Sequence, residues 1–94
     1  MATYFMFGRY SADAVKQITA ARTKRAAATI KKLGGQVRAI YALLGQHDLV
    51  LIADLPGTQE AVRASIALSR LTGIAFSTAP AMPVEEFDEL VSKG

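Results

Sequence analysis

The residues best suited to chemistry near neutral pH are His47, the only histidine of the chain, and Asp48, which follows it. A histidine side chain exchanges protons near neutral pH, and a neighbouring carboxylate can tune it, as in a general acid or base. Adjacent residues of an extended segment point to opposite sides, however, so Asp48 is not automatically the partner of His47. The structural alternative is an aspartate that ends a tight turn and accepts hydrogen bonds from backbone amides. We therefore predict that Gly45 and Asp48 fix the turn, whereas His47 lies at a subunit interface or pocket rim as the one candidate catalytic residue.

Aromatic and basic residues on the expected strands form a second group of candidates. The three tyrosines could present phenol groups to a ligand. Two strand arginines could each bind a carboxylate or phosphate through two N–H groups. The alternative for the aromatic residues is a place in the core or in a dimer interface, and for the arginines it is solvent. The candidate ligand-pocket residues are Tyr4, Met6, Arg9, Arg38, Tyr41, His47 and Phe76.

Other kinds of site have little support in the sequence. Ser77 and Thr78 could bind or activate an oxygen-bearing substrate, but no general base adjoins them. Gly34, Gly35 and Gly57 lack the strand–turn–helix context of a phosphate-binding loop. Because the chain has no cysteine and a single histidine, we predict no disulfide, no metal site and no cofactor.

Size and composition restrict the class of protein. The 94 residues, 51% hydrophobic and 20% charged, predict a single folded domain over residues 1–94. No apolar run approaches the roughly 20 residues that a membrane-spanning helix needs, and the N-terminus does not resemble a signal peptide. We therefore expect a cytoplasmic protein with no membrane partner. A domain this small has a marginal core, and without disulfides or metals self-association is the usual source of added stability.

Charge is unevenly distributed along the chain. Residues 1–47 contain eight Lys or Arg and one acidic residue, whereas residues 48–94 contain three Lys or Arg and seven acidic residues. A basic half could neutralise the phosphates of a nucleic acid. No aromatic-interleaved basic loop or recognition helix accompanies the charge, so we interpret it as a solvated helix face and expect no nucleic-acid partner.

Hydrophobic periodicity and turn residues predict the order of the elements. We expect a strand over residues 3–10, a helix over 12–33, strands over 36–44 and 49–53, a helix over 59–71, a strand over 74–81 and a short helix opening at Pro83. Thr58 is the expected N-cap of the second long helix, and Gly73 is its expected end. Arg22 falls within the apolar stripe of the first helix, so either its stem extends along the surface or the helix breaks near residues 19–23.

The order β-α-β-β-α-β is that of a ferredoxin-like α+β fold, in which both long helices cover one face of an antiparallel sheet. The first strand carries Phe5 and Phe7 on one side and Tyr4 and Met6 on the other, and the third strand is likewise apolar throughout. A strand that is apolar on both sides is buried on both sides. Because a single domain of this size has no second layer to offer, we predict a homodimer in which two sheets pack face to face.

The residues around the central hairpin resemble the GYD domain family. The matching segments are residues 33–37 (LGGQV), 41–50 (YALLGQHDLV) and 54–57 (DLPG), and the resemblance extends over nearly the whole chain. The family is named for a Gly-x-Tyr-Asp signature, which here falls on residues 45–48 with His47 in place of the tyrosine. The resemblance implies a ferredoxin-like domain that assembles as a dimeric α/β barrel. It implies little chemistry, because the function of the family is uncharacterised.

Three classes of function remain open on the sequence. The first is a small-ligand-binding or sensing module, a homodimer or larger homo-oligomer whose apolar and aromatic cavity admits a small organic molecule. The second is a cofactor-free enzyme of the dimeric-barrel kind, a monooxygenase or isomerase with His47 or a tyrosine as acid or base. The third is a structural or interaction module without a ligand. The discriminating feature is any cavity walled by Tyr4, Met6, Phe7, Tyr41 and Phe76.

Overall fold

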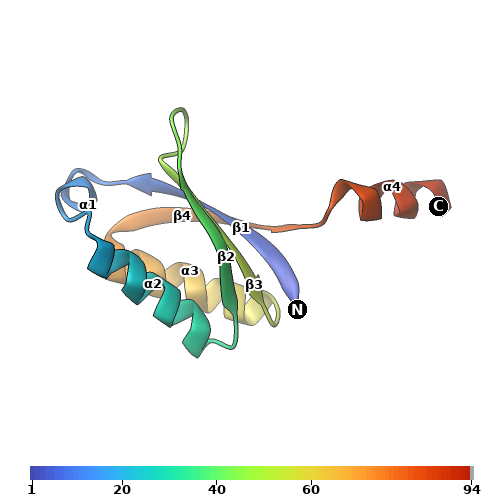
Figure 1. Cartoon of the computed structure of the whole chain (residues 1–94), viewed down its shortest axis with the longest axis horizontal. Coiled ribbons are helices and arrows are strands. Elements are labelled where there is room, and N and C mark those ends of the chain that lie inside the picture. Colours follow the sequence, from blue (N-terminus) through green and yellow to red (C-terminus); the bar gives the residue numbers. More distant parts are fainter. Residues whose placement is uncertain (94) are drawn as a thin grey trace.

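A computed structural model describes residues 1–93 as an antiparallel sheet with helices on one of its faces (Figure 1). The elements are β1 (Ala2–Tyr10), α1 (Ala12–Lys16), α2 (Ala20–Lys32), β2 (Gln36–Ala42), β3 (Leu49–Leu55), α3 (Thr58–Thr72), β4 (Ile74–Ala81) and α4 (Val84–Lys93). The strands are ordered β2-β3-β1-β4, and all neighbouring pairs are antiparallel. This is the predicted ferredoxin-like α+β fold, with β1 and β3 as its central strands.

The first helical segment is divided into two helices, so a continuous helix over residues 12–33 is wrong and the alternative of a break near residues 19–23 is confirmed. Thr19 is the N-cap residue of α2, and its side-chain oxygen accepts a hydrogen bond from the backbone N–H of Arg22 at 3.0 Å. Arg22 is turned inward and is 7% exposed. Its Nη1 donates to the carbonyl of Ala14 at 2.7 Å, and its guanidinium lies 5.7 Å from the centre of the Tyr10 ring. The charged side chain therefore joins the two helices and the end of β1.

The two strands of the central hairpin also differ from their predicted lengths. β2 ends two residues early, because the chain enters its turn where the N–H of Leu43 donates to the carbonyl of Asp48 at 2.8 Å. β3 runs two residues longer than predicted, because Asp54 still pairs with Thr3 of β1. The extension moves Asp54 from a turn into the sheet.

The second long helix begins one residue earlier than predicted. Gly57, not Thr58, is therefore the N-cap residue, and no side chain caps α3. The carbonyl of Gly57 accepts the N–H of Ala61 at 3.0 Å. At the other end Gly73 has a φ of 72°, the left-handed conformation that favours glycine, and it ends the helix as predicted.

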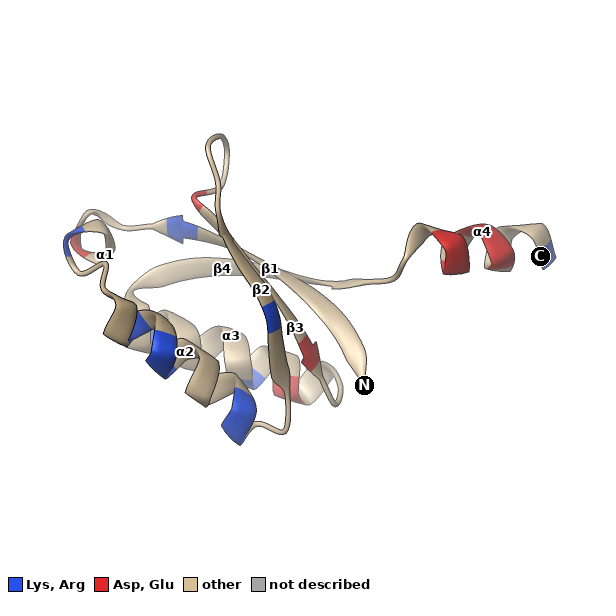
Figure 2. Ribbon diagram, in the orientation of Figure 1, with Lys and Arg blue, Asp and Glu red and all other residues tan. Residues whose placement is uncertain are grey.

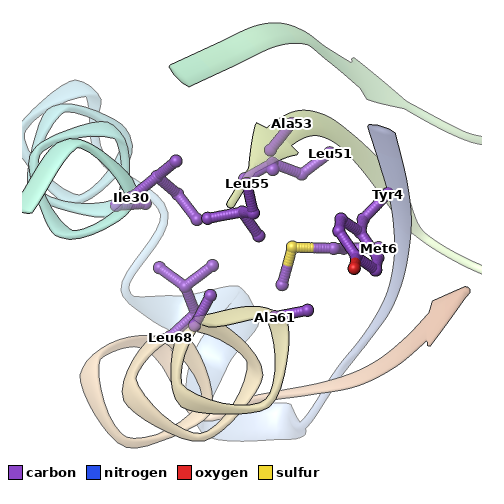
Figure 3. Close-up of a cluster of buried hydrophobic side chains, with 10 residues drawn as sticks. Tyr4, Met6, Ile30, Leu51, Ala53, Leu55, Ala61 and Leu68 are labelled. Carbon is purple, nitrogen blue, oxygen red and sulfur yellow. The ribbon is translucent and has the colours of Figure 1, made fainter. Parts of the chain in front are cut away.

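The core lies between the sheet and the two longer helices α2 and α3 (Figure 3). Its largest fully buried side chains are Met6 of β1, Ile30 of α2, Leu51 and Leu55 of β3, and Leu68 of α3. Buried alanines contribute the remaining helix contacts, and such small side chains let helices approach closely. The inner side of the sheet is thus filled by one apolar layer.

Within residues 1–93 no helix covers the opposite side of the sheet (Figure 1). The strand register places Phe5 opposite Ile52 and Phe7 opposite Val50, and it aligns β2 residues beside both pairs. We call this side the open face, formed by Phe5, Phe7, Ala39, Tyr41, Val50 and Ile52. The rings of Phe5 and Phe7 lie 6.2 Å apart, centre to centre. The prediction that β1 and β3 are apolar on both sides is confirmed.

The C-terminal helix α4 extends away from the sheet beyond the end of β4 (Figure 1). None of its residues is buried. Helical periodicity places its apolar residues on one side, and these are Val84, Phe87, Leu90 and Val91. Figure 2 shows acidic residues along α4 and basic residues along α2, toward opposite ends of the molecule. The domain therefore has two uncovered apolar surfaces, the open face and one side of α4.

Candidate functional site

The seven ligand-pocket candidates lie on two different sides of the sheet. Tyr4 and Met6 are buried in the core, and Phe76 packs against it. The other candidates, Arg9, Arg38, Tyr41 and His47, lie on or beside the open face. A single cavity walled by Tyr4, Met6, Phe7, Tyr41 and Phe76 therefore does not form, because the sheet separates Phe7 and Tyr41 from the other three.

His47 and Asp48 make separate contacts at the turn between β2 and β3. Oδ2 of Asp48 accepts a hydrogen bond from the backbone N–H of Tyr10 at 2.9 Å. The backbone N–H of Asp48 donates to the carbonyl of Gly8, also on β1, at 2.9 Å. The His47 ring packs against Phe7, with ring centres 5.1 Å apart. Gly45 has a φ of 149°, which favours glycine in this turn. Asp48 thus ties the turn to β1, and its carboxylate does not orient the imidazole.

The two candidate arginines lie far apart on the sheet, and each has a partner within the chain. Arg9 donates its Nε–H to the carbonyl of Gln46 at 3.1 Å, beside the turn. Arg38 donates from Nη1 to Oδ2 of Asp54 at 3.0 Å, and its side chain is 59% exposed. The arginines therefore do not converge on one carboxylate or phosphate.

Asp54 is a binding-site candidate that was not predicted from the sequence. The hydroxyl of Thr3 donates to Oδ1 of Asp54 at 2.7 Å, while Arg38 binds the other oxygen. The Thr3 hydrogen bond, aided by the hydrogen bond and charge of Arg38, holds the pKa of Asp54 below its ordinary value despite partial desolvation. This cluster borders a groove of about 300 Å³ lined by Thr3, Phe5, Arg38, Ala81, Met82 and Pro83. Asp54 could have been found from the sequence only by predicting the register between β1 and β3, which places it opposite Thr3.

A second cavity, of about 200 Å³ and open to solvent on one side, lies on the inner side of the sheet between α3 and the strands β1 and β4. We call it the hydroxyl cavity, lined by Tyr4, Thr58, Ala61, Val62, Ser65, Thr78 and Pro80. Four of these seven side chains carry a hydroxyl group, and none carries a charge. The cavity is therefore polar at defined points but electrically neutral.

Two hydroxyls of this cavity bind each other. The oxygens of Ser65 and Thr78 lie 2.6 Å apart, and Ser65 also donates to the carbonyl of Ala61 at 2.9 Å. Because Ser65 has one hydrogen to give, Thr78 is the donor in the bond between them. Thr78 was a candidate on the sequence, whereas Ser65 was not. A signal was present, since Ser65 lies four residues after the buried Ala61 and three before the buried Leu68, on the apolar stripe of α3.

Phe76, the remaining aromatic candidate, lines a smaller cavity of about 70 Å³ that also contacts Tyr10 and the buried Arg22. No group of three or more His, Cys, Asp or Glu side chains that could hold a metal ion occurs among residues 1–93. In the same range, every helix is too short or too polar to cross a membrane.

Comparison with known proteins identifies the family. Residues 4–91 match the GYD domain. No curated protein matches the sequence. Two similar solved structures are the leucine response regulatory protein LrpA of Mycobacterium tuberculosis and an AsnC family transcriptional regulator of Agrobacterium tumefaciens, at 8% and 19% identity. Each has a TM-score of 0.58 and aligns with 87% of this chain, which spans about half of their length (51% and 50%). At these identities the likeness establishes the ferredoxin-like fold alone, whereas the match over residues 4–91 shows that this chain belongs to the GYD domain family.

Proposed function

We propose that this chain is a small-molecule-binding module that acts as a homodimer, with the open faces of two copies packed against each other. The observation that carries the proposal is the apolar character of the open face. An antiparallel sheet with helices on one side normally presents polar residues to water on the other. Here Phe5, Phe7, Val50 and Ile52 occupy that side. Burial of this surface is favourable by about 25 cal/mol for each Å² removed from water.

A second copy of the chain is the partner that fits this face best. Two identical apolar faces are complementary under a two-fold axis, which gives an isologous interface. Charge also favours self-association, since the acidic α4 of one copy and the basic α2 of another attract each other (Figure 2). The apolar side of α4, which includes Phe87 and Leu90, is exposed in the single chain and gains a surface to cover it in a dimer.

Ligand binding is favoured over catalysis by the arrangement of the polar groups. The imidazole of His47 packs on Phe7, and the neighbouring carboxylate is engaged by the backbone N–H of Tyr10. A general acid or base needs both a reachable proton site and an orienting partner. The grooves and cavities of the domain instead combine apolar walls with a few fixed polar groups, as small-molecule sites do.

The decisive experiment is sedimentation velocity at micromolar concentration on the wild-type chain and two matched variants. Ile52→Asp places a charge on the open face, and Ile66→Asp places the same charge on α3, where the isoleucine is 48% exposed. We expect the wild type and Ile66→Asp to sediment as dimers, and Ile52→Asp to sediment as a monomer with its circular dichroism spectrum retained. A charge buried without a partner in the interface opposes association strongly.

A wild-type protein that sediments as a monomer would overturn the proposed assembly. An Ile52→Asp variant that remains a dimer would also contradict it, because the interface would then lie elsewhere. Should Ile52→Asp fail to fold, cross-linking through a cysteine introduced at Ala39 provides the second measurement. Ala39 lies next to Ile52 on the open face, so disulfide-linked dimers are expected to form there and not at an equivalent cysteine at Ala28, which is exposed on α2.

A further inference from the structure

We infer that the hydroxyl cavity is the ligand site of this domain and that it takes a small, uncharged molecule with a hydrogen-bonding group, of the phenol or alcohol class. The inference rests on the proposed ligand-binding function and places the ligand inside one protomer. It does not place the ligand between the open faces. The hydrogen-bonding groups of the site belong to Tyr4 of β1, Ser65 of α3 and Thr78 of β4.

Tyr4 is the first argument for a ligand. Its side chain is buried, with 6% of the residue exposed, yet its hydroxyl has no hydrogen-bond partner among residues 1–93. No side-chain oxygen or nitrogen in the described chain is both fully inaccessible and unpaired, so the Tyr4 hydroxyl retains access to free space. That space is the hydroxyl cavity, which Tyr4 lines. Figure 3 shows its oxygen on the side of the ring toward α3. A buried tyrosine hydroxyl normally finds a partner, and a ligand would supply it.

The pair of Ser65 and Thr78 is the second argument. Ser65 donates to Ala61 and accepts from Thr78, so the hydrogens of both hydroxyls are already used. The oxygen of Thr78 keeps its acceptor capacity. The site therefore offers a donor at Tyr4 and an acceptor at Thr78, which a phenol or alcohol hydroxyl matches by accepting one bond and donating another.

The lining determines the charge and size of the ligand. No charged side chain borders the hydroxyl cavity, and burial of an ion without a counter-charge is strongly unfavourable. The remaining walls, Ala61, Val62 and Pro80, are apolar. A volume of about 200 Å³ is below the roughly 300 Å³ at which sites for drug-sized ligands begin. A single substituted ring or short chain fits these conditions, and a nucleotide does not.

The inference is tested with 4-fluorophenol as the probe and 4-fluorobenzoate as a charged control of similar shape. Fluorine NMR of each probe measures its affinity for the full chain, and ¹H–¹⁵N spectra of the protein locate the binding. We expect 4-fluorophenol to bind and to shift the amides of Val62, Ser65 and Thr78. We expect 4-fluorobenzoate to bind at least tenfold more weakly.

Two tyrosine variants distinguish probe binding in the hydroxyl cavity from probe binding on the open face. Tyr4→Phe removes the unpaired hydroxyl and should weaken 4-fluorophenol binding about fivefold to tenfold, the usual effect of one lost hydrogen bond. Its melting temperature should not fall, because this hydroxyl has no partner in the chain. Tyr41→Phe makes the same change on the open face and should leave the affinity unchanged. Thr78→Val should weaken binding to a similar degree as Tyr4→Phe, through loss of the acceptor.

The outcomes distinguish this inference from the proposed dimer. Absence of 4-fluorophenol binding at millimolar concentration, or amide shifts confined to the open face, would overturn the hydroxyl cavity as the site. Equal affinities for wild type and Tyr4→Phe would do the same. Sedimentation of the same samples reports assembly separately. A monomer that still binds the probe in the cavity would refute the dimer and leave the site intact, and a dimer that does not bind it would do the reverse.

Discussion

Replacement of Asp48 by alanine tests the role of the turn that carries the family signature. Its carboxylate accepts the backbone N–H of Tyr10 at 2.9 Å and thereby fastens the loop between β2 and β3 to the end of β1. In Asp48→Ala the N–H of Tyr10 loses its acceptor, and the turn keeps only its backbone hydrogen bonds and the bond from Arg9 to the carbonyl of Gln46. The perturbation is confined to one hydrogen bond, because no other side-chain bond to Asp48 is present among residues 1–93.

The expected magnitude follows from the charge and burial of this bond. Hydrogen bonds to charged groups contribute about 1.5–3 kcal/mol to stability. Asp48 is half-buried and the Tyr10 N–H lies at a strand end, so water compensates part of the loss and we expect about 1.5–2 kcal/mol. For a domain of this size that corresponds to a fall in Tm of roughly 6–16 °C. Asp48→Asn retains a neutral acceptor and should lose about half as much.

Urea denaturation followed by circular dichroism, at one fixed protein concentration, measures the free energy of unfolding of each variant. Concentration must be constant because association of folded chains raises apparent stability. Asp88→Ala is the matched control, since Asp88 is exposed on α4 and makes no ion pair or side-chain hydrogen bond within the described chain. Its stability should change by less than about 0.5 kcal/mol. If Asp48→Ala is no less stable than Asp88→Ala, the bond to Tyr10 does not hold the turn and the reasoning fails.

His47→Tyr restores the aromatic residue of the family signature and should be tolerated within about 0.5 kcal/mol in the same urea series, because a tyrosine ring can also pack on Phe7; a collapsed variant would contradict this placement. Arg22→Met should lose about 2–4 kcal/mol, since it removes a buried charged hydrogen bond and a cation–π contact, whereas Arg22→Ala should cost at least as much. The pKa of Asp54 is lower in the folded chain than in the unfolded chain. The stability that its carboxylate contributes is therefore fully present above its unfolded pKa and is lost as the pH falls through its folded pKa. Arg38→Met moves the folded pKa of Asp54 toward its unfolded value, so in thermal melts from about pH 6 to pH 2 the variant should lose less stability than the wild type, and equal losses in the two proteins would refute it.

The fold was accessible from the sequence because its signals are local. Alternation in β1 separates Phe5 and Phe7 from Tyr4 and Met6 without any tertiary information, and Gly73 marks a helix end through its own backbone preference. The break before α2 was signalled by one residue that violated a periodic stripe. Arg22 could be interpreted in two ways because the carbonyl it binds, that of Ala14, belongs to α1, and the position of α1 relative to α2 depends on the break itself.

The candidate site was less accessible because it depends on which strands and helices face each other. Asp54 becomes a partner of Thr3 only through the antiparallel register of residues 51 positions apart. Ser65 meets Thr78 only because α3 packs on β4. Tyr41 could not be assigned to the same side as Phe7 from composition, since the irregular register between Val37 and Ala39 sets which β2 residues face that side.

The edges of the sheet restrict how copies of this chain add to one another. β2 forms one edge, and its register shifts at Val37–Ala39, beside the exposed charge of Arg38. β4 forms the other edge, and its Pro80 has no backbone N–H to donate. A bulge, a charge and a proline are the features by which natural sheets discourage strand-by-strand addition of further molecules. Growth into continuous ribbons is thereby hindered at both edges, which favours the proposed closed pair over a fibre as the way to bury the apolar side of the sheet.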